Sequence, residues 1–185
     1  WVIDTLYLST LVNIEKPYHK LLKDYKFIDK ENDPEKDALK CRKLFVDCMN
    51  WFNKFPMNDR NIYYSLLHNR EEFEYFFRFY NKEFSELEIY EDDDLTKELN
   101  TVFSEFVDEW FDMLHFIKEM PIEIAYFYRL LKLKNEKHLD LSVFPKWINH
   151  VLPKTALIYD EIRKYRKYDL HKKLKEYFWY DEGKQ

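Results

Sequence analysis

The feature that most restricts the fold of this chain is its near-absence of glycine. Of its 185 residues only one is glycine, Gly183, close to the end of the sequence. Phosphate-binding loops, dinucleotide fingerprints, nucleophile elbows and calcium loops all need glycine at defined positions, because the backbone there has no room for a Cβ atom. Tight two-residue hairpin turns also favour glycine. The sequence therefore excludes these motifs and disfavours an extensive antiparallel sheet.

Hydrophobic periodicity favours an all-α fold. Hydrophobic residues make up 46% of the chain, which is enough for a sizeable core. Apolar residues recur at three- and four-residue steps, and prolines separate the periodic segments. No internal repeat divides the chain, so we predict a single domain, residues 1–185, built as a bundle of six or seven helices. The periodicity predicts a first helix that begins near residue 6 and stops or kinks at Pro17. It predicts further helices over 34–52, 60–80 (capped by Asn58 or Asp59), 95–117, 124–133, 141–152 and 153–170.

Charge is unevenly distributed along the chain. The total of 30 basic and 35 acidic residues gives a net charge of -5, so we do not expect nucleic acid as a partner. Residues 83–112 contain twelve acidic residues against Lys97 alone, whereas residues 113–180 contain fourteen basic and eight acidic residues. We expect an acidic face and a basic face that compensate each other. The apolar runs are too short to predict a membrane span.

The two cysteines predict a reducing environment. Cys41 and Cys48 lie seven residues apart on a predicted helix, a rise of about 10 Å that is too long for a disulfide. We interpret them as buried free thiols of an intracellular, reducing compartment.

The sharpest local pattern is a pair of carboxylates, Glu109 and Asp112. Residues three apart lie on one face of a helix, so both side chains would project together. With oxygen ligands from a facing helix, such a pair can hold Mg²⁺.

Three segments together resemble a known family. Residues 109–116, Glu-Trp-Phe-Asp-Met-Leu-His-Phe, resemble the second metal motif of the all-α dimeric dUTPases, relatives of the MazG-type nucleotide pyrophosphohydrolases. Residues 46–53 resemble the first metal motif, and residues 6–13 resemble the opening helix, which ends in Leu-Asn. The first metal motif reads Asp47-x-x-Asn50 in place of two glutamates, and an insertion at about 58–95 would explain the long separation from Glu109.

The resemblance implies Mg²⁺-dependent hydrolysis of dUTP to dUMP and pyrophosphate by a homodimer. The ions would neutralise the triphosphate and polarise the attacking water. Because Asn50 is uncharged, we expect weaker Mg²⁺ binding than at a site with four carboxylates. The roles implied are Mg²⁺ ligation by Asp47, Asn50, Glu109 and Asp112, catalysis by Asp47, Glu109 and Asp112, base reading by Asn13, and phosphate binding by Arg163, Lys164 and Lys167.

Two other functions stay open. Arg166 and His171 have the R-x4-H spacing and resemble HEPN ribonucleases, in which an arginine and a histidine on one helix act at an RNA phosphate. Alternatively, the chain is a non-catalytic helical subunit of a larger assembly that retains a degraded metal motif. The aromatic residues 177–179 would suit such an interface.

Overall fold

The computed structural model describes residues 5–14, 33–84, 86–104 and 111–137, and side chains up to residue 133. All regular secondary structure in these ranges is helical, which confirms the predicted all-α class. The helices predicted at 141–152 and 153–170 lie outside the described ranges. The seven described helices are α1 (Thr5–Val12), α3 (Pro34–Phe52), α4 (Met57–Leu67), α5 (Glu74–Glu83), α6 (Asp92–Phe103), α7 (Met113–Glu119) and α8 (Pro121–Lys137).

Local sequence signals mark the starts of three helices: α3 begins at residue 34 as predicted, whereas α6 and α8 each begin three residues before the predicted 95 and 124. The Asp33 carboxylate accepts hydrogen bonds from the backbone N–H groups of Glu35 and Lys36, both at 3.1 Å, and Pro34 is the first helical residue of α3. α6 begins with Asp92, Asp93 and Asp94, whose charges favour the positive end of the helix dipole. α8 begins at Pro121.

The predicted helix over 60–80 is wrong as a single element. α4 ends at Leu67 and α5 begins at Glu74, because the turns between them place Phe73 in the core, fully buried. α5 then returns over α4, where the Phe77 ring lies 5.2 Å from that of Tyr64. Nor does Asp59 cap α4, because it lies inside the first turn and is buried.

The predicted helix over 95–117 is also interrupted. α6 ends at Phe103, and Phe111 and Asp112 are not helical. Asp112 instead caps α7, because its carboxylate accepts a hydrogen bond from the backbone N–H of His115 at 3.0 Å. Asp112 therefore precedes a new helix and does not share a continuous helix with residue 95.

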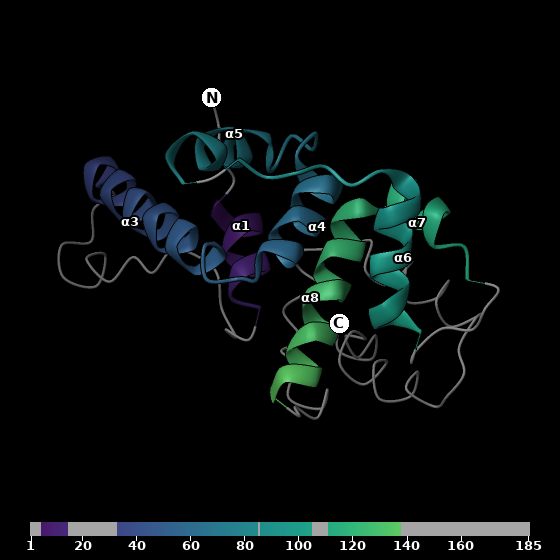
Figure 1. Ribbon diagram of the computed structural model, residues 1–185. Coiled ribbons are helices and arrows are strands. Elements are labelled where there is room, and N and C mark those ends of the chain that lie inside the picture. The colour runs from purple at the N-terminus through teal and green to yellow at the C-terminus, as the bar shows by residue number, and fades with distance from the viewer. Residues whose placement is uncertain (1–4, 15–32, 85, 105–110, 138–185) are drawn as a thin grey trace, which may run out of the picture.

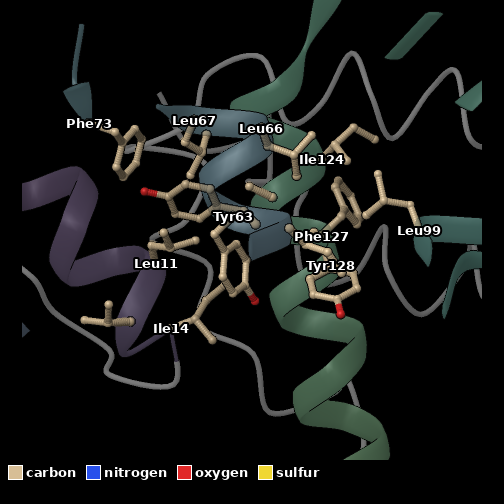
Figure 2. Close-up of a cluster of buried hydrophobic side chains, with 14 of the residues drawn as sticks. Leu11, Ile14, Tyr63, Leu66, Leu67, Phe73, Leu99, Ile124, Phe127 and Tyr128 are labelled. Carbon is tan, nitrogen blue, oxygen red and sulfur yellow. The ribbon is translucent and has the colours of Figure 1, made fainter. Parts of the chain in front are cut away.

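The helices surround a core that is rich in aromatic side chains. α4 packs against α8, α6 packs against α7 and α8, and α3 packs against α1 (Figure 1). Figure 2 shows side chains from α1, α4 and α8, including Leu11, Tyr63 and Phe127, converging between these helices. Both cysteines are free thiols, as predicted, and Cys48 is buried, but Cys41 is only half-buried and so departs from the prediction of two buried thiols. Within the described ranges, no helix combines the length and apolarity needed to cross a bilayer.

Candidate functional site

The described residues of the expected magnesium site do not lie together in the structure. Asp47, which is half-buried, and Asn50, which is exposed, lie on α3, whose main neighbour is α1. Asp112 precedes α7, which packs against α6 and α8. Figure 1 shows α3 and α7 at opposite sides of the molecule. The prediction that the element with Asp47 packs against the element with Asp112 is therefore wrong, because α3 directs Phe52 into the aromatic core beside α5.

The other expected site residues are only partly placed. Asn13 follows the end of α1, and its side chain is half-buried. Glu109 lies outside the described residues, as do Arg163, Lys164 and Lys167 of the expected phosphate site and Arg166 and His171 of the alternative ribonuclease pair. Across the ranges that are described, no three histidine, cysteine, aspartate or glutamate side chains gather closely enough to hold a metal ion.

A buried polar cluster that the sequence did not predict joins α4 to α8. Asp59 is only 3% exposed. Its Oδ1 atom accepts a hydrogen bond from the Tyr128 hydroxyl at 2.8 Å and lies 3.3 Å from the Lys132 ammonium nitrogen. The two partners are separated by one turn of α8, so both reach the same carboxylate. No local sequence signal identifies this pairing, because Tyr128 lies 69 residues from Asp59.

The environment of the cluster keeps the Tyr128 hydroxyl protonated. Burial, and then the negative charge of Asp59 and the hydrogen bond to it, raise the pKa of Tyr128 far above its ordinary value. The Lys132 ammonium group also lies 5.9 Å from the centre of the Tyr128 ring. Because the Asp59 carboxylate already contacts a lysine and a tyrosine, we interpret it as a structural link between α4 and α8 and not as a reactive group.

A second polar network fixes the end of α3. Arg60 Nη1 donates to Asn53 Oδ1 at 3.0 Å and to the Tyr80 hydroxyl oxygen at 2.6 Å, and that hydroxyl donates to the same Asn53 oxygen at 2.7 Å. Arg60 lies on α4 and Tyr80 on α5, and Asn53 is the residue that ends α3. The network thus holds the C-terminal end of α3 in place and leaves its N-terminal half to project.

An open cleft of about 370 Å³ lies between α4 and α5. The rings of Tyr64 and Phe77 line it, with His68 and the ion pair of Arg78 and Glu74, whose atoms lie 2.6 Å apart. Because Arg78 is already paired with Glu74, this cleft does not offer the several cations that a triphosphate needs.

The two large apolar side chains that α3 exposes lie on one face of the helix, two turns apart. Leu39 is 57% exposed and Val46 is 48% exposed, and Arg42 and Lys43 between them are exposed as well. These positions follow the i, i+3, i+4, i+7 spacing of one helix face. We call the four residues Leu39, Arg42, Lys43 and Val46 the α3 face. Beside it, the ring of Phe79, 44% exposed on α5, lies 5.5 Å from that of Phe45.

Comparisons with known proteins add no relative from which a site could be transferred. No protein-family model matches the chain, and neither a curated protein nor a solved structure matches it.

Proposed function

We propose that this chain is a non-catalytic helical protein that binds another protein through the α3 face. The observation that carries the proposal is the exposure of Leu39 and Val46, one above the other on a helix that projects from the body of the molecule (Figure 1). The i, i+3, i+4, i+7 pattern is the one by which helices present anchor residues to a partner.

The energetics support a binding role for these residues. Burial of a leucine or valine side chain is worth about 1.5–3 kcal/mol, which the isolated fold does not gain for side chains that are half exposed. Single exposed apolar residues are common, but α3 exposes two on one face, Leu39 and Val46, and the exposed Phe79 packs against Phe45 of the same helix, which favours an interaction surface. Arg42 and Lys43 would then supply charges at the edge of the contact and select a partner of opposite charge.

A Mg²⁺-dependent nucleotide pyrophosphohydrolase is the second candidate. The packing of α1 against α3 supports it, since this places the segment with Asn13 beside the segment with Asp47, two of the three that resemble the dUTPase family. Against it, Asp112 serves as the cap of α7, and α7 lies at the opposite side of the molecule from α3 (Figure 1). We therefore give preference to the binding role.

Site-specific photo-cross-linking tests the binding role. A photoreactive amino acid is introduced at Leu39 or Val46, and at the exposed Lys97 on α6 as a matched control, in cells that produce the chain. We expect an adduct of defined mass from positions 39 and 46 and none from position 97. If positions 39 and 46 give no adduct, the α3 face is not a binding surface.

Pyrophosphate release separates the two candidates. The purified chain is incubated with each dNTP at millimolar Mg²⁺. A non-catalytic protein releases no pyrophosphate above the blank. Turnover that is lost in Asp112→Asn would instead establish the pyrophosphohydrolase, because Asn preserves the helix cap while it removes the carboxylate charge.

A further inference from the structure

We propose that the cleft between α4 and α5 binds a small organic cation, one that carries a quaternary ammonium group. The cleft shares no residue with the α3 face, and no sequence motif predicts a site there. Its volume of about 370 Å³ lies at the lower end of the range for ligand pockets, which favours a ligand of few atoms.

Three aromatic rings line the cleft at an angle to one another. The centre of the Tyr64 ring lies 5.2 Å from that of Phe77, with the two planes inclined at 57°. It lies 5.0 Å from the centre of the His68 ring, with an inclination of 52°. Inclined rings can contact a ligand from several directions, whereas a stacked pair offers only its outer faces. Because the face of an aromatic ring attracts cations, such a group of rings is typical of sites for quaternary ammonium ions.

Two of the three rings are held in place by contacts within the fold. Phe77 is buried, and its ring also lies 5.7 Å from that of Phe52 in the core. His68 Nδ1 lies 2.8 Å from the backbone oxygen of Tyr64, one turn earlier on α4. Because a carbonyl oxygen only accepts hydrogen bonds, Nδ1 carries the hydrogen, and this contact fixes the orientation of the imidazole ring. Side chains that are already fixed bind a ligand at a lower entropy cost.

The charged residues of the cleft are compatible with a cation. Glu74 supplies a carboxylate, and Arg78 contacts its Oε1 atom at 2.6 Å. An ionised carboxylate has about four acceptor sites, so this contact leaves Glu74 able to attract a second cation. The guanidinium group of Arg78 lies at the exposed rim, 5.7 Å from the centre of the Tyr75 ring. A quaternary ammonium ion also has no N–H group, so it needs no hydrogen-bond acceptor in the cleft.

The chain around the cleft has an excess of negative charge. Residues 68–78 include three glutamates, Glu71, Glu72 and Glu74, against two arginines. One of these arginines, Arg70, donates from Nη2 to the backbone oxygen of Lys118 on α7, at 3.4 Å. A local excess of carboxylates raises the concentration of cations and lowers that of anions. The electrostatics therefore favour a cationic ligand over a carboxylate or phosphate.

Titration of choline into the full chain tests the site. The proton NMR signal of the choline N-methyl groups is followed at about pH 8, where histidine side chains are ordinarily neutral. Contact with aromatic rings shifts this signal, so we expect a saturable shift with a dissociation constant of about 1 mM or below. The matched probe is the uncharged analogue of choline in which carbon replaces the quaternary nitrogen. It has the shape of choline without the charge, and should bind at least about tenfold more weakly.

The ammonium group is carried either by a free molecule or by a trimethylated lysine side chain, and a second titration separates these sources. A short peptide with trimethyl-lysine is compared with choline and with the same peptide carrying unmodified lysine. Tighter binding of the trimethylated peptide than of choline identifies the modified side chain as the ligand. Tighter binding of choline identifies a free molecule.

Variants assign the binding to the cleft. Glu74→Gln removes the carboxylate charge and should raise the dissociation constant of choline about tenfold. Tyr64→Leu removes one ring and should raise it about threefold or more, whereas Tyr64→Phe keeps the ring and should bind like the wild type. The matched controls are Glu83→Gln and Phe79→Leu, at exposed positions of α5 outside the cleft, and both should bind like the wild type. Circular dichroism checks that each variant keeps its helical content.

Three outcomes would overturn the inference. The first is a choline signal that does not shift at millimolar concentrations. The second is equal binding of the uncharged analogue, which would mean that the cleft does not recognise charge. The third is an equal loss of binding in Glu74→Gln and Glu83→Gln, since the overall charge of the chain would then explain the attraction. If Tyr64→Leu does not fold, the comparison of these two glutamine variants still decides.

Discussion

Truncation of Phe52 gives a quantitative test of how α3 is anchored. Phe52 lies in the last turn of α3 and is fully buried. Five aromatic rings surround it, with centroids 5.1–6.1 Å away, and most of these contacts are edge-on or tilted. The rings belong to Phe55, Tyr63, Phe76, Phe77 and Tyr80. They place Phe52 at the junction of α3 with α4 and α5.

The magnitude of the effect follows from burial and from the cavity left behind. Phe52→Ala removes roughly 100 Å² of buried apolar surface, worth about 2.5 kcal/mol, and the residual cavity adds about 1–2 kcal/mol. We therefore expect the free energy of unfolding to fall by about 4 kcal/mol, a large share of the 5–15 kcal/mol typical of a domain. Phe52→Leu retains most of the volume and should cost about 1–2 kcal/mol. Phe79→Ala, at a 44% exposed position, should cost less than about 1 kcal/mol.

Urea denaturation followed by circular dichroism measures all three variants. The slope of unfolding free energy against urea should stay constant, so that a change in midpoint reports stability alone. If Phe52→Ala is too unstable to fold, the loss of stability in Phe52→Leu can still be compared with the loss in Phe79→Ala. A loss below about 1 kcal/mol in Phe52→Ala, or an equal loss in Phe79→Ala, would refute the packing of α3 against the aromatic core.

Three further predictions concern polar groups. Asp112→Ala removes the cap that binds the backbone N–H of His115 and should cost about 1 kcal/mol, whereas Asp112→Asn should cost a few tenths, as measured by thermal unfolding. Burial raises the pKa of Tyr128 in the folded protein above its value in the unfolded chain, so its contribution to stability should be complete below about pH 10 and fall at higher pH. Tyr128→Phe should therefore make the fall of unfolding free energy with pH less steep, by up to about 1.4 kcal/mol per pH unit. Urea titrations at pH 9 to 11 measure this difference. Asp59→Ala should cost about 3 kcal/mol and Lys132→Met, at a partly exposed lysine, about 1 kcal/mol, and a double-mutant cycle should show coupling of at least about 0.5 kcal/mol. An additive cycle would mean that Asp59 and Lys132 do not interact.

Local sequence signals predicted helix starts well and helix breaks poorly. Asp33 with Pro34 and the acidic run at 91–94 act within one turn of the chain, so their effect on the backbone is readable from neighbouring residues. The break between α4 and α5 has no such signal. It forms because Phe73 gains burial by leaving the helical path, and that gain exists only once other helices surround it.

For the candidate sites as well, the spacing of residues could be predicted from the sequence, but their placement in the fold could not. The i, i+3, i+4, i+7 spacing of the α3 face is present in the sequence, but its exposure is not, since the same spacing equally describes a buried face. The expected pairing of Asp47 with Asp112 came from the resemblance to a family and not from any contact signal in the chain. The structure places these two residues on elements that face different neighbours.

By itself the sequence determined the helical class of this protein, because its three- and four-residue apolar spacing lets a helix bury one face and a single glycine disfavours tight hairpins. Only the tertiary structure decided which polar groups meet. Asp59 on α4 contacts Tyr128 and Lys132 on α8, whereas Asp47 lies on α3 and Asp112 caps α7, and these two helices are at opposite sides of the molecule (Figure 1). The physical reason is that periodicity specifies which residues share a helix face, whereas the choice of facing helix depends on the apolar area that all helices bury together.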